Sequence, residues 1–271
     1  MAGEIGSSRT SASPWRVPWL RVARRGFFFA RFVAAVACAG ADALFRSLTG
    51  RTRTVDRAAW LQRWSRLVLR SVGIRVTVKG TPPTSGMLVS NHLSYLDILV
   101  ISSAHPFVFV SKAEVGSWPV FGILARMGGT LFVRRDRRTD VRRLNAEVIT
   151  AVERGVVVVV FPEATSSNGH QILPFHASLL APAVDNGWSV TPAWVGYQMP
   201  EGSVEEEVCY WRDMVFFPHL LTLISCSSIT AEVRFGSAVR PSVDRKEFAL
   251  QLRDAVADLG GLAPAPAPTP R

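Results

Sequence analysis

The chain has 271 residues, of which 48% are hydrophobic and 19% charged, and its formal net charge is +10 at pH 7. This length accommodates one large α/β domain with extensions, while three widely separated cysteines exclude a disulfide framework and a cysteine metal site. The charge is concentrated in residues 1–75, which hold fourteen arginines against three acidic residues.

The N-terminal segment divides into a polar and an apolar part. Residues 1–25 are basic and rich in small residues, and we expect them to be disordered. An apolar stretch follows from Gly26 to Phe45, interrupted by Arg31 and Asp42. A transmembrane helix needs roughly 20 apolar residues with few charges, so this stretch fits a spanning helix and a half-embedded helix equally well.

The next segment, Asp56 to Val72, has the apolar spacing of a basic amphipathic helix. It is typical of a membrane-surface helix and also of a helix packed on the main domain, and both interpretations stay open. Its arginines alternate with large apolar residues, which favours an anionic membrane over nucleic acid. No nucleic-acid-binding motif is present. Residues 26–73 are therefore predicted to be membrane-associated helices.

From residue 74 onward, short apolar runs alternate with helical patterns, which predicts an α/β fold with a mixed, largely parallel central sheet flanked by helices. The domain is expected to span residues 74–260, followed by a disordered Ala/Pro tail at 261–271. The predicted strands are 75–79, 87–90, 107–111, 130–134, 156–161, 190–195 and 230–235. The predicted helices are 97–103, 118–127, 140–154, 176–186 and 244–259.

The pattern that bears chemistry follows the strand predicted at 87–90. His92 comes directly after it, and Asp97 opens the next helix. Open α/β folds bind ligands beyond the carboxyl ends of their strands. Five helical residues separate two side chains by about 140°, so the pair meets only if Asp97 reaches back to a turn containing His92. A carboxylate on one imidazole nitrogen leaves the other nitrogen as a base, and the substrate can supply the nucleophile.

The same residues also have a purely structural interpretation. Ser94-Tyr-Leu-Asp97 fits the capping box that starts many helices and needs no catalytic duty. A histidine and an aspartate at this spacing are too common to decide between the two interpretations. The segments that follow in the chain distinguish the catalytic interpretation from the capping one.

Two later segments place polar groups after predicted strands. Gly128 to Arg135 contains a glycine turn, a short strand and arginines, and the planar guanidinium of Arg135 suits phosphate oxygens. The alternative is a basic surface loop. Phe161 to Gly169 follows a strand of consecutive valines, with Glu163 beside a proline and hydroxyl residues after it. It is typical of a site for a polar head group and also of an ordinary turn.

With the proline-containing segment 190–193, these blocks resemble the glycerolipid acyltransferase family of the PlsC, or 1-acylglycerol-3-phosphate acyltransferase, type. The resemblance spans residues 75–240, and the blocks stand in the family's order. The matching residues are Asn91, His92 and Asp97, then Lys112, Glu114, Pro119 and Gly122, then Gly129, Phe132 and Arg135, then Phe161 through Ser166, and Pro192.

The resemblance implies transfer of an acyl group from acyl-CoA or acyl carrier protein to the free hydroxyl of a lysophospholipid. The first candidate is 1-acylglycerol-3-phosphate, which would give phosphatidic acid. No cofactor or metal is implied, and the expected place is the cytoplasmic face of the inner membrane. His92 would be the general base, oriented by Asp97. The implied substrate-binding residues are Asn91, Lys112, Gly129, Phe132, Arg135, Glu163, Ala164, Thr165 and Ser166.

The chain departs from the family pattern at two positions. Ala164 stands where the family has glycine, so the backbone there either avoids a positive φ or accepts strain. Ser166 stands where the family has an arginine that would help to hold a phosphate. The acceptor head group is therefore open, and lyso-ornithine lipid is an alternative. A non-catalytic lipid-binding relative and a transacylase without a thioester donor also stay open.

Overall fold

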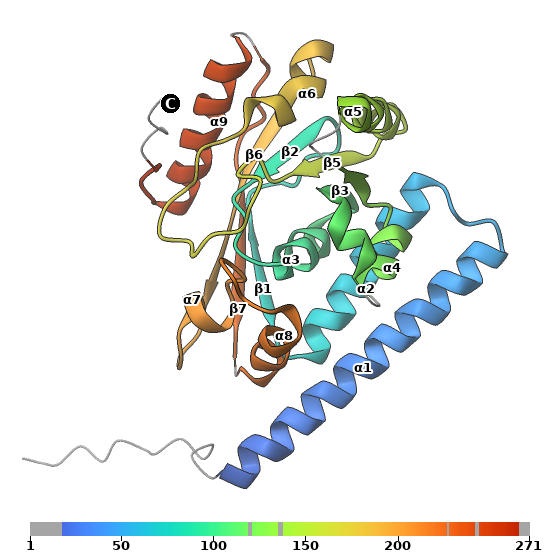
Figure 1. Ribbon diagram of the computed structural model, residues 1–271, viewed down its shortest axis with the longest axis vertical. Helices are drawn as coiled ribbons and strands as arrows, with labels where there is room; N and C mark the ends of the chain where they lie inside the picture. Colours follow the sequence, from blue (N-terminus) through green and yellow to red (C-terminus); the bar gives the residue numbers. More distant parts are fainter. Residues whose placement is uncertain (1–17, 119–120, 135–137, 227, 242–243, 266–271) are drawn as a thin grey trace, which may run out of the picture.

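The computed structural model describes residues 18–118, 121–134, 138–226, 228–241 and 244–265. It contains a seven-stranded sheet in the order β1-β7-β6-β2-β5-β3-β4 (Figure 1). All neighbouring strands are parallel except β6 and β7. This confirms the predicted α/β class with a mixed, largely parallel sheet. The strands are β1 Arg75–Lys79, β2 Met87–Ser90, β3 Phe107–Lys112, β4 Leu131–Val133, β5 Val157–Val160, β6 Val190–Gln198 and β7 Thr230–Phe235.

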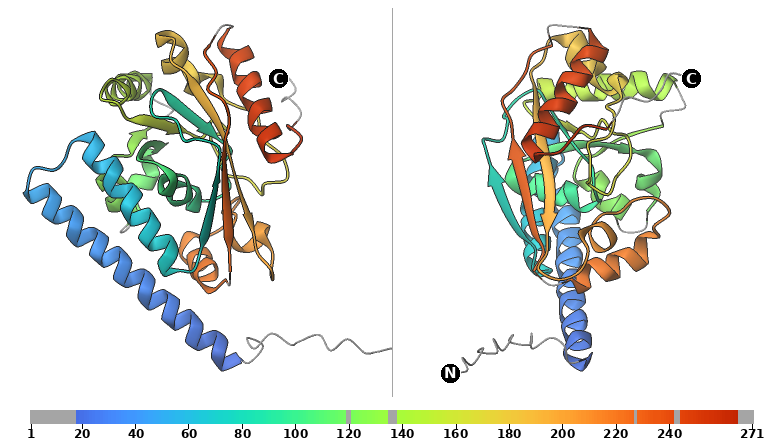
Figure 2. Two further views of the ribbon diagram at one scale, coloured as in Figure 1. Left: turned by 180° about the vertical axis from the view of Figure 1, so that it is seen from behind. Right: turned by 90° about the vertical axis from the view of Figure 1, so that its left-hand side faces the viewer.

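Helices cover both faces of the sheet (Figure 2). One core forms beneath α2, α3 and α8, and a second forms beneath α5, α6 and α9. The helices are α1 Pro18–Leu48, α2 Thr54–Ser71, α3 Leu96–Ala104, α4 Phe121–Met127, α5 Arg138–Glu153, α6 Ala181–Asn186, α7 Val204–Glu207, α8 Phe216–Ser225 and α9 Arg245–Gly260. Two 3₁₀ segments, η2 (Ala113–Ser117) and η3 (Ala177–Leu180), precede α4 and α6.

The centre of the sheet explains its valine-rich sequence. Strand β5 lies between β2 and β3 and pairs with both in parallel. All four of its residues are buried, because helices cover both faces of a largely parallel sheet. The carboxyl ends of β2 and β5 therefore meet at one edge, where residues 91–97 and 161–166 leave the sheet.

Strand β6 is longer than the sequence predicts, ending at Gln198 and not at Val195. Its partner β2 stops at Ser90, which pairs with Ala193. The remaining residues of β6 are held by the antiparallel strand β7 up to the pair Gln198 and Thr230. Strand β6 thus continues past the end of β2 and alongside the loop that contains His92.

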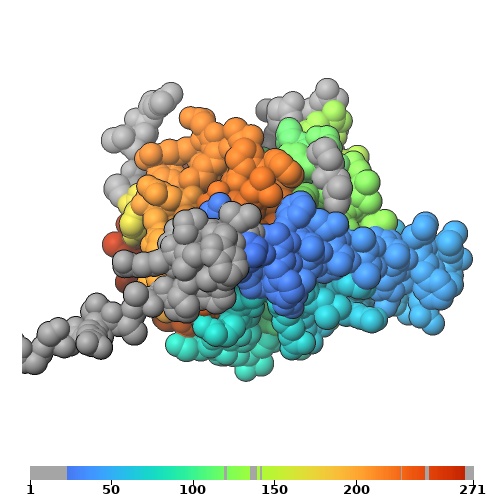
Figure 3. Space-filling view, turned by 90° about the horizontal axis from the view of Figure 1, so that it is seen from below, coloured from blue at the N-terminus to red at the C-terminus, as the bar shows by residue number. Residues whose placement is uncertain are grey.

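Helix α1 begins at Pro18, so the disorder predicted for residues 1–25 is wrong from residue 18 onward, while residues 1–17 lie outside the described part of the chain. The helix packs on the domain: the Trp64 indole donates to the Asp42 carboxylate at 2.8 Å, and Arg24 donates to the Ser225 carbonyl at 2.7 Å. Within Ala23–Leu48 an 18-residue window has a mean hydropathy of 1.7, so this part of the helix is long and apolar enough to cross a membrane. Figure 3 shows it running across one face of the molecule.

Other elements differ from the predictions at their ends and in number. The helix predicted at 118–127 comprises only α4, and the one predicted at 176–186 begins as η3. Helix α8 is not among the predicted helices. The tail predicted as disordered docks at its start, because Ala265 donates its N–H to the Ile172 carbonyl and accepts from Arg253. Residues 266–271 lie outside the described residues.

Candidate active site

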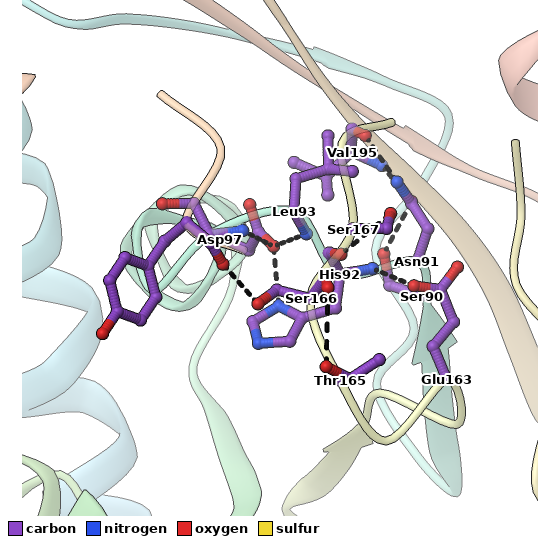
Figure 4. Close-up of polar contacts among 12 residues, drawn as sticks. Ser90, Asn91, His92, Leu93, Asp97, Glu163, Thr165, Ser166, Ser167 and Val195 are labelled. Atoms are coloured by element: carbon purple, nitrogen blue, oxygen red, sulfur yellow. Dashed lines mark hydrogen bonds and ion pairs between the residues drawn. The ribbon is translucent and has the colours of Figure 1, made fainter. Parts of the chain in front are cut away.

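The structure brings His92 and Asp97 into contact beyond the end of β2. The Nδ1 of His92 lies 2.8 Å from Oδ2 of Asp97, at the first turn of α3 (Figure 4). A carboxylate only accepts, so Nδ1 carries the hydrogen and Nε2 is left with a lone pair in the neutral ring. In the described part of the chain, Nε2 has no hydrogen-bond partner. This geometry is the one that a general base requires.

Asp97 is fully buried, and four groups donate to it. Besides His92, the backbone N–H groups of Leu93 and Ser94 donate to Oδ2 at 2.7 and 3.0 Å. The Tyr197 hydroxyl donates to the other oxygen, Oδ1, at 2.5 Å. Charge-assisted hydrogen bonds of this kind offset the cost of burying a carboxylate.

Of the two hydrogen bonds that define a capping box, Ser94 and Asp97 form only one. Asp97 accepts the Ser94 N–H, as the reciprocal arm of a capping box does. The Ser94 hydroxyl, however, is buried without a hydrogen-bond partner and caps nothing. The second oxygen of Asp97 and its bond to His92 go beyond what helix capping needs.

The imidazole of His92 is fixed on one face as well as at one nitrogen. It stacks on the Phe161 ring with 4.1 Å between centroids and 17° between planes. Its side chain is 22% exposed, while Asp97 beneath it is inaccessible. The ring thus has one buried edge and one edge open to a substrate. Phe161 reaches this position because it follows β5, the neighbour of β2.

Asn91 contacts the neighbouring strand and not the open side of the site. Its side-chain Nδ2 donates to the Val195 carbonyl at 2.9 Å, and its Oδ1 accepts the Val195 N–H at 2.8 Å. The side-chain amide therefore replaces a peptide group just where β2 ends. Asn91 is fully buried, and both groups of its side-chain amide bond the main chain of Val195, so it positions the loop that carries His92.

Glu163 is also buried and also positions this loop. Its two carboxyl oxygens accept the backbone N–H groups of His92 at 3.2 Å and Leu173 at 3.1 Å. Burial raises the pKa of Glu163 to about 8, the charge of Asp97 adds to this, and the two backbone donors oppose it. With only 3% of the residue exposed, Glu163 faces the protein and not a head group.

The turn after Glu163 shows how the chain accommodates its two departures from the family pattern. Ala164 has a φ of +62°, the left-handed conformation that favours glycine, in a turn closed by its N–H to the Phe161 carbonyl. The Ser166 hydroxyl donates to the Tyr210 carbonyl. Thr165, between them, is exposed. Ser166 thus ties the turn to the segment before α8, and Thr165 is the residue of this block that faces solvent.

The remaining predicted residues lie further from His92. Lys112 is exposed at the carboxyl end of β3, the same sheet edge as His92 but beyond β5. Phe132, on β4, pairs with Ser111. Gly129 precedes β4, at the amino-terminal end of that strand, and its predicted substrate contact stays a prediction. Its φ of +82° turns the chain there. Arg135, the predicted phosphate ligand, lies outside the described residues.

Sequence reasoning missed Tyr197 as a member of the site. The signal was the alternation of Ala193, Val195 and Tyr197, which all enter the same core as Leu93 and Leu96. The strand was predicted to end at Val195, before Gly196, which is three residues too early.

An apolar groove of about 640 Å³ lies between α1, α4 and α8. It borders an aromatic cluster in which the Phe216 ring lies 5.0 Å from Tyr95 and 4.8 Å from Phe121, centroid to centroid. Phe27 and Phe217 nearby are 56% and 59% exposed. An exposed apolar surface of this extent is typical of contact with lipid or another apolar partner. The lining residues are Phe29, Phe32, Val33, Val36, Ala37, Gly40, Phe121, Ile123, Leu124, Met127, Phe216, Phe217 and Leu220.

Within the described residues, no group of three or more His, Cys, Asp or Glu side chains is placed to hold a metal ion. The side chains of the site offer one imidazole nitrogen open to a substrate, a buried carboxylate behind it, and the exposed Thr165 hydroxyl on the turn after β5.

Comparison with known proteins points to one family. Residues 74–196 match the family model described as Acyltransferase. The lyso-ornithine lipid O-acyltransferase of Rhodobacter capsulatus is 36% identical over 189 residues, which cover 68% of this chain and 67% of that protein. Its counterpart in Pseudomonas aeruginosa is 33% identical over 234 residues, covering 84% and 90%. The 1-acyl-sn-glycerol-3-phosphate acyltransferase of Neisseria gonorrhoeae is 31% identical over 204 residues, covering 73% and 80%.

The fold also matches a solved structure. The crystal structure of the 1-acyl-sn-glycerophosphate acyltransferase PlsC from Thermotoga maritima superimposes with a TM-score of 0.64, covering 89% of this chain and 96% of that one. The sequence identity is 21%, so this match concerns the fold.

Proposed function

Because the chain belongs to the PlsC-type acyltransferase family, we propose that it moves a fatty acyl group from acyl-CoA or acyl carrier protein to the free hydroxyl of a lysolipid, with His92 as general base. The observation that carries the proposal is the bond from His92 Nδ1 to the buried Asp97, which leaves Nε2 facing outward. No covalent acyl-enzyme, metal or cofactor takes part in it.

In the proposed reaction, Nε2 of His92 accepts the proton of the lysolipid hydroxyl as the oxygen attacks the thioester carbonyl. Asp97 stabilises the imidazolium that forms. When the tetrahedral intermediate collapses, the carbon–sulfur bond breaks and the thiolate takes the proton from the imidazolium. The products are the acylated lipid and the free thiol, and His92 returns to its neutral state.

For the acceptor, we place lyso-ornithine lipid ahead of 1-acylglycerol-3-phosphate, which reverses the order implied by the family resemblance. Two observations support this. Ser166 replaces the arginine that the family uses near a phosphate, and its hydroxyl is committed to the Tyr210 carbonyl. Two relatives that are 36% identical are named lyso-ornithine lipid O-acyltransferases, while the 1-acyl-sn-glycerol-3-phosphate acyltransferase of Neisseria gonorrhoeae is 31% identical. 1-Acylglycerol-3-phosphate remains the second candidate.

The experiment is an acceptor panel with purified enzyme: lyso-ornithine lipid, 1-acylglycerol-3-phosphate and other lysophospholipids, each with acyl-CoA and with acyl carrier protein. We expect thioester-dependent acylation by the wild type and a loss of at least about 10³-fold in His92→Ala, the scale of removing a general base. Lipid binding without thioester consumption would show a non-catalytic relative. Acylation that persists without any thioester would show a transacylase.

We further propose that the enzyme works at the cytoplasmic face of the inner membrane, where both thioester donors are found. The supporting observations are the apolar helix α1 and the exposed apolar side chains beside it on α8. The exposed Arg25 and Arg31 on α1 suit anionic lipid head groups.

A further inference from the structure

The oxygen of Asp97 that points away from His92 is held by a residue outside the family blocks. Tyr197 donates its hydroxyl to Oδ1 at 2.5 Å, across 100 residues of sequence. The other three donors all bind Oδ2. Asp97 has no exposed surface, so solvent does not reach Oδ1. Within the described residues, the hydrogen bond to Oδ1 therefore depends on one phenol.

The position of this phenol follows from the sheet. Ser90 pairs with Ala193, and the Asn91 side chain then bonds the main chain of Val195. Tyr197 is two residues further along β6, so it projects to the same face. Strand β7 holds this part of β6, with Tyr197 opposite Ala231. The hydroxyl is thus presented by a paired strand and not by a mobile loop.

We propose that Tyr197 is a positioning residue of the acyl transfer, which orients Asp97 and sets the negative charge that its carboxylate presents to His92. The proposal rests on the proposed role of His92. A donor on Oδ1 withdraws charge from the carboxylate, so the imidazolium is stabilised less than it would be by a free carboxylate.

The groups that surround the pair are compatible with this role. Burial and the nearby charge of Asp97 raise the pKa of Tyr197 well above its ordinary value, so it remains a donor over the whole working range. The other titratable groups nearby are Glu163 after β5, Tyr95 just before α3 and Cys209 before α8. Burial raises the pKa of Cys209 to about 12 and that of Tyr95 further, so both stay neutral. Glu163, whose pKa burial raises to about 8, titrates in the range of interest.

The test is Tyr197→Phe, which removes one oxygen atom and keeps the ring. We expect the acid limb of the pH profile of kcat/KM to move to higher pH by about 0.5–1 unit, because the carboxylate regains charge. At the plateau, kcat should fall by about 5–50-fold, since Asp97 loses one of its anchors, and the KM of each substrate should stay within about twofold. The same shift should appear in a Glu163→Gln background, where Glu163 no longer titrates.

Tyr95→Phe is the matched control. Tyr95 also loses a buried hydrogen bond on substitution, but its hydroxyl contacts Nδ1 of His219 at 3.0 Å and not Asp97. We expect both variants to lower the thermal unfolding temperature, and only Tyr197→Phe to move the acid limb. An unmoved acid limb in Tyr197→Phe, or an equal shift in Tyr95→Phe, overturns the proposal.

His92→Ala separates this proposal from the one on which it rests. If His92→Ala is inactive and Tyr197→Phe has the wild-type pH profile, the role of Tyr197 is wrong while the general base stands. If His92→Ala retains wild-type turnover, the proposed function itself fails, and the role of Tyr197 fails with it.

Discussion

Ala164 occupies a backbone conformation that costs an L-residue free energy. Its φ of +62° lies in the left-handed region, at the start of the turn that ties Ser166 to Tyr210. The Cβ contact with the following carbonyl costs about 1–2 kcal/mol there, and glycine avoids it. The turn is held by hydrogen bonds on both sides, so the chain tolerates the strain and does not refold to relieve it.

We therefore expect Ala164→Gly to stabilise the protein by about 0.5–1 kcal/mol, the relief of strain less the greater chain entropy of unfolded glycine. The free energy of unfolding from urea titration measures this. Ala146→Gly, in the exposed middle of α5, is the control and should cost about 1 kcal/mol. Destabilisation by Ala164→Gly would show that the turn does not hold the residue in the left-handed region.

Single residues of the site were predictable from the sequence to different degrees. His92 and Asp97 were found because their spacing, five residues across a strand-to-helix turn, is local. The buried roles of Asn91 and Glu163 were not, since each depends on a partner 71 or more residues away, namely Val195 for Asn91 and His92 for Glu163. Polar type and strand-end position suggest a substrate contact, and only the packing shows that the side chain points inward.

At the scale of whole elements, α8 divides into a buried and an exposed side. His219, Leu220, Leu223 and Ile224 are buried, while Phe217 and Leu221 face outward beside the groove along α1. The structure shows that the core takes one side of the helix and leaves the other side without a protein partner among the described residues.

We expect Phe217→Asp to weaken binding to anionic vesicles at least about tenfold, because a buried Phe contributes about 1.5–3 kcal/mol of transfer free energy and the new carboxylate repels the surface. Folding should be preserved, since an acidic residue at the first turn of a helix is favourable. Co-sedimentation with vesicles measures the effect. Leu250→Asp, at an equally open position on α9 across the sheet, should bind as the wild type does. Equal loss in both variants would contradict a specific membrane face.

Element boundaries were predictable where the hydrophobic pattern ended in a turn, as for β1, β2 and β7. They were missed where pairing overrode local sequence. Strand β6 runs through Gly196 because β7 supplies hydrogen bonds on its other side. The docking of residues 261–265 was missed because Ala and Pro have little local signal, and it is the Arg253 side chain and Ile172 that hold them.

At the scale of the molecule, the burial of Glu163 couples folding to pH. Its pKa is about 8 in the folded protein against 4.5 ordinarily, so the folded state binds a proton more tightly than the unfolded state between these values. The contribution of Glu163 to stability is thus greatest below about pH 4.5, and this contribution is lost as the pH rises toward 8.

We expect the free energy of unfolding to fall between pH 5 and 8 by at most about 1.4 kcal/mol per pH unit from this group. Chemical denaturation at half-unit steps measures the slope, and Glu163→Gln should make it shallower because a neutral amide does not titrate. A slope equal in the wild type and in Glu163→Gln would show that the two backbone donors keep Glu163 ionised.

The overall architecture was predictable because the alternation of apolar strands and helical segments specifies a largely parallel sheet, and such sheets bring the ends of neighbouring strands together. The antiparallel pairing of β7 with β6 was not, since a lone strand after a helical segment can enter a sheet at an edge or between two strands, and in either direction. Here β7 lies between β1 and β6.

The attachment of α1 has a consequence for lipid traffic. The helix is bonded to the domain near both of its ends, through Arg24 to Ser225 and through Asp42 to Trp64. While these contacts hold, α1 lies along the domain and does not project from it. For the acyl transfer proposed above, we therefore expect the protein to work from one leaflet. Substrate is then taken from that leaflet and product returned to it. Any new diacyl lipid needed in the opposite leaflet must be flipped by another protein.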